Sequence, residues 1–452
     1  MGKSKKGIFV LGLDFGTAYT KCVLRNLSNE GECWPIEFTS KGRKTYFIDS
    51  LLHIRDGKRL SPLQSSMEKD DSIIRFLKMR LLSKLVKSAS IWEDDDPIEL
   101  CMVDAAFFLS HIIAKCRDHI EENFYSDVLD TDPHNMYDLY INMCLPVAAQ
   151  NDKAKEVFLK VLLAAYSITR LRSTDAVLPK YEEIEDIIKD ESKLYSYKEF
   201  CLCYPETSAN LISFLKSPAR QSGYYALVDV GGGTVDVTLL EYNSTNTEKP
   251  LWYYHSEVIY EGSSQIEIRV KKHLPQKTVR EIRNYKESYE ERNNPGNVDD
   301  QLREVYKSVI LEIHNRVGKA MGDCISNSFN KFGASSMDAC KRRIRNMKFF
   351  FCGNGMSKNP YEIGTRFFHS EKGWGWLPGP DSVPFQPPGD LYNKYSSIFI
   401  DNRIFKRLSV AYGMSFMSEN LTVCMFPGDI PISAIQIEMQ RGHNPAADYE
   451  ET

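Results

Sequence analysis

Two short segments of this chain follow the same plan, and they lie 215 residues apart, counted from Asp14 to Asp229. In residues 8–24 and again in residues 225–240, an apolar run ends at the aspartate, a glycine-bearing turn closes on a threonine, and a second apolar run follows. Glycine lets the backbone take positive φ and approach a ligand closely. Successive turn N–H groups form a concave site that suits phosphate. The repeat therefore predicts two β-hairpins that clamp one nucleotide triphosphate.

The bulk properties of the chain restrict its class. At 452 residues it is too long for one hydrophobic core, so we expect at least two domains. Its net charge of −4 gives no general attraction to nucleic acid or to anionic membranes. No apolar run approaches the ~20 residues that span a bilayer, and the N-terminal segment lacks the apolar core of a signal peptide. We therefore expect a cytoplasmic protein that binds neither nucleic acid nor membrane.

The metal-binding residue types show no familiar zinc pattern. None of the 11 cysteines belongs to a CxxC pair, and the 9 histidines include no HExxH motif. Most cysteines lie in apolar runs, as Cys144 and Cys352 do. This usage predicts buried, reduced thiols.

Apolar spacing predicts the main elements. The predicted helices are residues 71–86, 103–124, 151–165, 300–325 and 403–417, and the predicted strands are residues 137–145, 200–204, 251–260 and 347–352. The helix at 300–325 has the clearest apolar stripe. We expect residues 93–96 to form a solvated acidic tip and residues 275–300 to form a polar segment with a turn. Residues 372–390, rich in proline, glycine and tryptophan, predict an ordered loop or a recognition surface.

Seven segments, taken in order, resemble the nucleotide-binding domain of DnaK-type heat-shock chaperones, within the actin, sugar-kinase and heat-shock ATPase superfamily. The resemblance runs from Ile8 to about Phe416, and its most specific motif is the triple glycine Gly231–Gly233 with its flanking Asp and Thr. The seven segments are residues 14–19, 75–81, 145–147, 205–209, 229–236, 351–357 and 410–413.

The resemblance implies an α/β, actin-like ATPase fold. It has two lobes, each with a ribonuclease-H-like mixed five-stranded sheet, around a central nucleotide cleft. Lobe I is expected at residues 1–220, completed by residues 400–425, and lobe II at residues 221–399. Residues 426–452 are expected to form a tail. We expect no counterpart of the peptide-binding domain that follows in a full chaperone.

The implied ligands are ATP or ADP with Mg²⁺. The residues expected to bind the nucleotide come from three loops and one lysine, which could lie over the adenine. They are Gly16, Thr17 and Tyr19; Gly231, Gly232, Gly233 and Thr234; Gly353, Asn354 and Gly355; and Lys358. Asp14 and Asp229 are expected to hold Mg²⁺ through water, since this ion prefers oxygen ligands and keeps several waters.

The implied chemistry is phosphoryl transfer to water, which needs mostly positioning and charge neutralisation. Lys78 would reach the γ-phosphate and stabilise its developing charge, while Glu206 and Asp236 would orient the attacking water or the metal shell. The predicted catalytic residues are Lys78, Glu206, Asp229, Thr234 and Asp236.

Plainer interpretations exist for the same residues. An aspartate at a strand end can cap a turn, and Thr234 can be a strand threonine with a local hydrogen bond. Lys78 can be one more basic residue on a solvated face, because Arg75, Arg80 and Lys84 lie close to it in sequence.

The chain also departs from the family pattern. Ala18 replaces a usual hydroxyl, and Arg407 falls near the place of an acidic residue. Residues 262–264 stand where a Leu-Gly-Gly turn is expected, Asn354 looks like an insertion, and the region between residues 269 and 301 is short, which puts the base specificity in question.

Three functions fit these observations. The first is a DnaK-like, chaperone-related ATPase that acts as a nucleotide-gated switch for a protein partner or client in trans. The second is an actin-like ATPase that forms filaments. The third is a nucleotide-binding scaffold with little turnover, for which residues 372–390 are the candidate partner surface. The sequence does not fix the oligomeric state.

Overall fold

The computed structural model divides the chain into two compact units, which we describe separately. Unit 1 comprises Met1–Ser213 and Pro387–Leu421, and unit 2 comprises Phe214–Gln386 and Thr422–Thr452. The structure describes residues 6–28, 32–40, 43–63, 71–92, 94–125, 136–145, 152–170, 179–215, 221–245, 251–292, 299–328, 346–353, 402–417 and 424–425.

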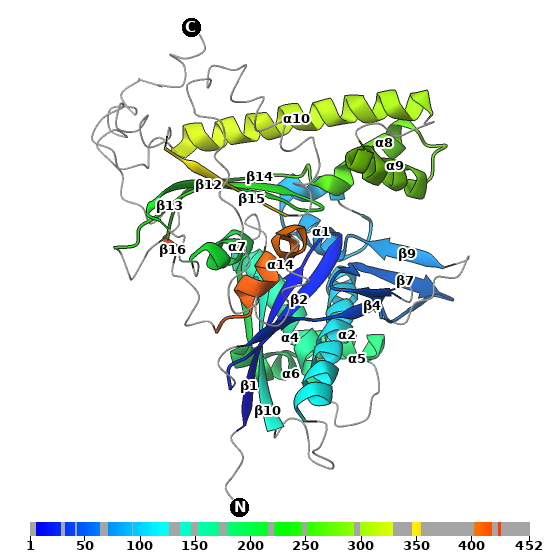
Figure 1. Ribbon diagram of the computed structural model, residues 1–452. Coiled ribbons are helices and arrows are strands. Elements are labelled where there is room, and N and C mark those ends of the chain that lie inside the picture. The colour runs from blue at the N-terminus through cyan, green and yellow to red at the C-terminus, as the bar shows by residue number, and fades with distance from the viewer. Residues whose placement is uncertain are drawn as a thin grey trace, which may run out of the picture. The chain divides into compact units, whose positions relative to one another are not determined.

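The main sheet of unit 1 has the order β11-β10-β1-β2-β3, and β6 also pairs with β2. β1 runs antiparallel to β2 and parallel to β10, which is parallel to β11 (Figure 1). The strands are β1 (Gly7–Phe15), β2 (Tyr19–Asn26), β3 (Cys33–Pro35), β6 (Ile48–Asp49), β10 (Tyr137–Leu145) and β11 (Cys201–Pro205).

Helices cover both faces of this sheet, which explains why β1 is apolar without alternation. On one face, Phe9 and Phe15 of β1 lie against α2 (Ile98–Phe124), with ring centroids 5.2 Å from Phe124 and 6.0 Å from Phe108. On the other face, α14 (Asn402–Met414) comes so close to Gly12 that an added Cβ would lie 1.9 Å from the Ala411 carbonyl oxygen.

Smaller elements complete unit 1. Two small sheets contain β4 (Phe38–Ser40) with β5 (Arg43–Thr45), and β7 (Leu51–Arg55) with β8 (Lys58–Arg59) and β9 (Ser72–Arg75). The remaining helices are α1 (Leu77–Ser83), η1 (Lys87–Trp92), α4 (Asp152–Arg170), α5 (Tyr181–Lys189), α6 (Glu191–Leu194), η3 (Tyr195–Phe200) and α7 (Glu206–Leu215).

Unit 2 repeats the central part of this sheet in the order β15-β12-β13-β14-β16. β12 runs antiparallel to β13 and parallel to β15, as β1 does to β2 and β10. The strands are β12 (Gly223–Val230), β13 (Val235–Tyr242), β14 (Leu251–Ile259), β15 (Lys348–Cys352) and β16 (Cys424–Met425). Its helices are α8 (Ser263–His273), α9 (Val279–Arg292) and α10 (Asp300–Ser328).

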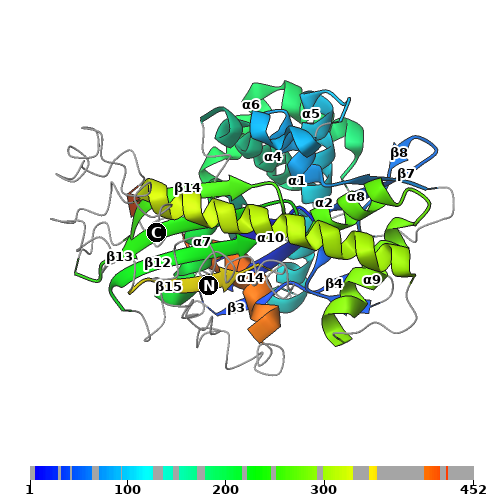
Figure 2. The same cartoon turned by 90° about the horizontal axis from the view of Figure 1, so that it is seen from above.

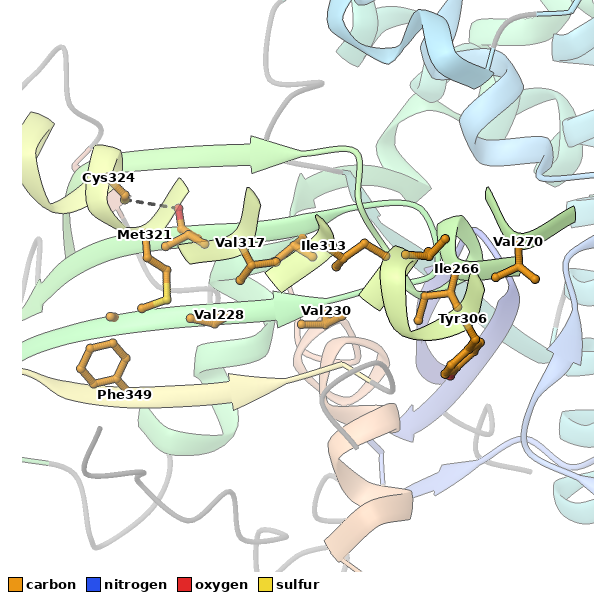
Figure 3. Packing of buried hydrophobic residues seen from close by; sticks show 14 of the residues in the cluster. Val228, Val230, Ile266, Val270, Tyr306, Ile313, Val317, Met321, Cys324 and Phe349 are labelled. Atoms are coloured by element: carbon orange, nitrogen blue, oxygen red, sulfur yellow. Dashed lines mark hydrogen bonds between the residues drawn. The ribbon is translucent and has the colours of Figure 1, made fainter. Parts of the chain in front are cut away.

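The core of unit 2 lies between the sheet and α10, which runs along the sheet (Figure 2). Ile313, Val317 and Met321 of α10 lie toward the sheet residues Val228 and Val230 (Figure 3), and all five are buried. The predicted apolar stripe of residues 300–325 thus packs on the sheet.

The predicted α/β, actin-like fold is confirmed, because both units carry the same antiparallel hairpin with a parallel strand beside its first strand. The fifth strand differs between the units. In unit 1, β11 lies beyond β10, whereas in unit 2 β16 pairs with the opposite edge, on β14. Since β16 belongs to unit 2, the expectation that residues up to 425 complete lobe I is wrong for residues 424–425.

Three local predictions also need correction. Residues 71–86 form strand β9 and then helix α1, separated by Phe76 with φ 60°. Residues 275–300 contain helix α9, which the high polarity of that segment concealed. Asp94 and Asp96 do not form a free solvated tip, because both pair with Arg80.

Two further findings concern the described residues. The nine cysteines whose side chains the structure describes are free and buried, in agreement with the sequence analysis. No helix there is long and apolar enough to cross a membrane.

Candidate functional site

The first hairpin places Asp14 at the end of β1, directly opposite Lys21 of β2. Both side chains pair, with Lys21 Nζ 2.5 Å from Asp14 Oδ2, and the carboxylate is only 2% exposed. The turn is tight, because the Gly16 amide donates to the Asp14 carbonyl at 3.0 Å. A Cβ on Gly16 would lie 2.3 Å from the Tyr19 carbonyl oxygen, so this position requires glycine.

Lys78 is buried in α1 and pairs with Glu206 at the start of α7. Its side chain is 4% exposed, and Nζ lies 2.9 Å from Glu206 Oε2. Burial alone would lower the pKa of Lys78, but the carboxylate of Glu206 outweighs burial and holds that pKa above its ordinary value. The interpretation of Lys78 as a residue on a solvated face is therefore wrong. Two predicted catalytic residues, 128 positions apart, are in contact.

Asp14, Cys144 and Glu206 meet at one edge of the unit 1 sheet. Since β1, β10 and β11 are parallel, their carboxyl ends lie side by side, and Glu206 directly follows β11. One ligand atom from each of the three residues lies within 4.8 Å of the other two. The Cys144 thiol donates to Asp14 Oδ1 at 3.4 Å. The same edge therefore carries two carboxylates, a thiol and the Lys78 ammonium group.

The second hairpin places Asp229 opposite Asp236 in unit 2, and both carboxylates are buried. The Gly231 amide donates to the Thr234 carbonyl at 2.9 Å and closes the turn. Thr234 Oγ1 donates to Asp236 Oδ2 at 2.9 Å. The local hydrogen bond that the sequence analysis considered for Thr234 is thus present, and its acceptor is one of the predicted catalytic carboxylates.

The triple glycine is fixed by the start of α8. The amides of Ser263 and Ser264 donate to the carbonyls of Gly231 and Gly232 at 3.0 and 2.8 Å, and the Gly262 amide donates to the Gly233 carbonyl at 3.2 Å. Residues 262–264, a departure from the family pattern in sequence, therefore hold the second loop.

Gly353 completes the unit 2 site at the end of β15. Its φ is +79°, and a Cβ would lie 2.4 Å from Asp229 Oδ1 and 2.3 Å from the Val230 carbonyl oxygen. Only glycine fits here. The other expected residues of this loop, Asn354, Gly355 and Lys358, lie outside the described residues, as do the segment 372–390 and the tail 426–452.

The two hairpins carry opposite charges at equivalent positions, a feature that the sequence analysis missed. Lys21 and Asp236 each follow their strand-end aspartate by seven residues and each lie opposite it. Unit 1 therefore has an aspartate–lysine pair where unit 2 has two aspartates. The seven-residue spacing was the available signal, because it fixes the register of a hairpin whose turn length is known.

Arg407 of α14 lies near the first loop. Its guanidinium carbon is 3.5 Å from the centroid of the Phe47 ring and 5.3 Å from that of Tyr19. Burial lowers the pKa of Arg407 below its ordinary value. Arg407, which stands near the usual place of an acidic residue, thus brings a positive charge to the neighbourhood of Tyr19, an expected nucleotide-binding residue.

Comparison with known proteins gives structural likeness alone. No protein-family model and no curated protein matches the chain. MreB5 of Spiroplasma citri bound to ADP is similar with a TM-score of 0.47 and 11% identity, over 90% of this chain and 95% of that chain. MreB 5 of the same organism bound to AMPPNP is similar with a TM-score of 0.43 and 10% identity, over 97% and 100%.

The topology of the two units carries the assignment of the fold without these likenesses. Each unit contains the antiparallel hairpin, the adjoining parallel strand and the aspartate at the end of the first strand that the actin-like ATPase fold repeats in its two halves. The narrower DnaK-type assignment gains no support from any of the comparisons.

Proposed function

We propose that this protein binds ATP with Mg²⁺ and hydrolyses it slowly. The observation that carries the proposal is the Lys78–Glu206 pair, in which the ammonium group is buried and the carboxylate is partly exposed, and which lies with Asp14 at the strand edge beside the first glycine turn. A buried ammonium group is costly to desolvate, and Lys78 is only 4% exposed. The presence of this charged pair beside a glycine turn that could bind phosphate supports a catalytic role for it.

The residues of each hairpin suit different parts of the nucleotide complex. The turn amides of residues 15–17 and 231–234 would bind phosphate oxygens, and Lys21 would add a positive charge at the first turn. In unit 2, the paired carboxylates Asp229 and Asp236 have the oxygen donors that hydrated Mg²⁺ prefers. The ion would neutralise charge on the phosphates.

Lys78 and Glu206 would then carry the hydrolytic step. Lys78 would stabilise charge on the γ-phosphate, and Glu206 would hold the attacking water. Asp14, the other metal ligand expected from the sequence, is already paired with Lys21. We therefore assign the ion to the unit 2 carboxylates, Asp229 and Asp236, in this proposal.

Hydrolysis of Mg²⁺-ATP by the wild-type protein and by Lys78→Ala tests the proposal. Removal of one preorganised charge-stabilising group costs about 10²- to 10³-fold in rate. Lys87→Ala is the matched control, because Lys87 follows α1 and is exposed. Equal rates for the wild type and Lys78→Ala would remove the catalytic assignment.

The consequence of turnover is a separate question. The resemblance implies a nucleotide-gated switch that acts on a partner in trans, and self-association into filaments is the alternative. Sedimentation with Mg²⁺-ATP separates them, since a switch stays in the supernatant whereas a filament pellets.

A further inference from the structure

Cys144 is the one member of the unit 1 strand-edge cluster that the proposed ATPase chemistry does not use. It ends β10 between two carboxylates, with Asp14 on the neighbouring β1 and Glu206 after β11. Both Asp14 and Cys144 are fully or almost fully buried, and Glu206 is partly exposed. The cluster therefore combines one sulfur donor and two carboxylate donors from three separate elements. The Glu206 carboxylate is the donor that solvent can reach.

This donor set selects a different metal from the one that a nucleotide requires. Mg²⁺ prefers oxygen ligands and avoids sulfur, whereas thiolates favour Zn²⁺ and related soft cations. A sulfur donor with two carboxylates is compatible with tetrahedral Zn²⁺, and three protein ligands leave the fourth position open for water or a phosphate oxygen.

The distances between the donor atoms are close to those found around a bound metal ion. Metal–sulfur and metal–oxygen distances of about 2.3 and 2.1 Å place tetrahedral donors roughly 3.5 Å apart. Cys144 Sγ and Asp14 Oδ1 are already 3.4 Å apart. The whole set lies within 4.8 Å, so a side-chain shift of about 1 Å at Glu206 would complete the geometry.

We propose that Asp14, Cys144 and Glu206 form a site for a thiophilic divalent cation such as Zn²⁺. Without the ion, Lys21 and Lys78 neutralise the two carboxylates. When the ion binds, the thiol proton leaves to solvent, the sulfur and two oxygens bond to the metal, and Lys78 separates from Glu206. The binding step does not depend on the proposed ATPase activity.

Titration of the full, nucleotide-free chain with Cd²⁺ tests this site, because thiolate-to-cadmium bonds give an ultraviolet charge-transfer band. We expect Cys144→Ser to lose about one bound ion per chain. Cys203→Ser is the matched control, since Cys203 is also buried, on the adjacent strand, and pairs in register with Met143. It should keep the wild-type stoichiometry. Equal stoichiometry in the wild type and Cys144→Ser would overturn the proposal.

Glu206→Gln provides a second test that does not alter the buried thiol. It should keep the charge-transfer band but weaken Cd²⁺ binding by about 10-fold or more, because loss of a direct ligand should cost at least as much as loss of an outer-shell partner. An excess of Mg²⁺ should leave the band unchanged. Unaltered Cd²⁺ affinity in Glu206→Gln, or loss of the band on adding Mg²⁺, would contradict the assignment. Failure of the chain to bind ATP would affect neither readout.

Discussion

At the scale of single residues, Gly353 shows how backbone conformation and the candidate site depend on each other. Its positive φ turns the chain at the end of β15, and the missing side chain leaves room for the Asp229 carboxylate. Gly57 has a similar φ of +75°, but a Cβ added there would meet nothing within 4 Å. A side chain at Gly57 would therefore be penalised only by the backbone conformation, whereas one at Gly353 would be penalised by the backbone conformation and by the contact with Asp229.

We predict that Gly353→Ala lowers the free energy of unfolding by about 2–4 kcal/mol, because left-handed backbone and overpacking both contribute. Gly57→Ala should cost about 1–2 kcal/mol from the backbone alone. Urea unfolding of the two variants measures the difference. Equal destabilisation would show that the close approach to Asp229 has no energetic consequence.

Thr234 gives a prediction for chemistry at the same scale. Its hydroxyl is bonded to Asp236, so Thr234→Ala removes both a proposed phosphate ligand and the group that orients this carboxylate. We expect ATP hydrolysis to fall by about 10- to 100-fold, and the free energy of unfolding to fall by about 1.5–3 kcal/mol because the lost hydrogen bond is to a buried carboxylate. Thr238→Ala, farther along the same strand β13, is the control. Equal hydrolysis rates in the two variants would count against the role of Thr234.

At the scale of elements, helix α1 is held in place by ion pairs of Arg80, which lies two residues after Lys78. Arg80 pairs with Asp94, Asp96 and Asp104, and Asp104 is fully buried. Breaking a buried pair by removing one partner costs about 3–5 kcal/mol. We therefore predict a loss of that size for Arg80→Ala in urea unfolding. Lys193→Ala, at an exposed pair, should change stability by less than about 1 kcal/mol.

A second network joins α8 to α9. Burial would raise the pKa of Glu267, but Lys286 and Arg283 outweigh burial and hold that pKa below its ordinary value. A depressed folded-state pKa gives stability that is present above the unfolded value of about 4.3 and is lost as pH falls through the lower folded value.

We therefore predict that Glu267→Gln is less stable than the wild type at pH 7 and that the gap narrows as pH falls below about 5. Denaturant unfolding at a series of pH values measures it. Glu304→Gln, at an exposed pair on α10, should show no comparable gap. A gap that stays constant down to about pH 3 would contradict the assignment of this stability to the Glu267 carboxylate.

The sequence predicted the elements in which one physical signal dominates. The hairpins follow from apolar runs interrupted by glycine turns, and α10 follows from its apolar stripe. The break between β9 and α1 could not be predicted, because Ile73 and Ile74 fit a helical stripe as well as a strand, and only the backbone of Phe76 decides between them. Helix α9 was missed because charged residues surround the two apolar residues, Ile282 and Tyr285, that it contributes to the core, so no apolar stripe is visible in the sequence.

The candidate site was predictable in part for a similar reason. Motifs marked Asp14, Lys78 and Glu206, and unit 1 brings these residues together. Cys144 and Lys21 escaped prediction because their positions depend on strand register. A strand alignment places Cys144 beside Asp14, and a hairpin pairing places Lys21 opposite it. The alignment of β1 with β10 is not visible in a local motif, whereas the hairpin pairing had the seven-residue spacing as its signal.

At the scale of the whole molecule, nucleotide binding should raise stability by linkage. A ligand that binds only the folded state at 100 times its Kd adds about 2.7 kcal/mol. We therefore expect Mg²⁺-ATP to raise the melting temperature of the chain. Chelation of Mg²⁺ with EDTA should reduce the shift, because the ion neutralises phosphate charge beside the carboxylates of unit 2. An ATP-induced shift that is insensitive to EDTA would argue against a metal at Asp229 and Asp236.

Calorimetric titration of the chain with Mg²⁺-ATP tests the central proposal most directly. We predict saturable binding of one ATP per chain, which is weakened in a variant that combines Lys21→Ala with Asp229→Asn, since the two changes remove a charge from each hairpin. Absence of binding heat over the full concentration range, with a parallel displacement assay also negative, would contradict the account.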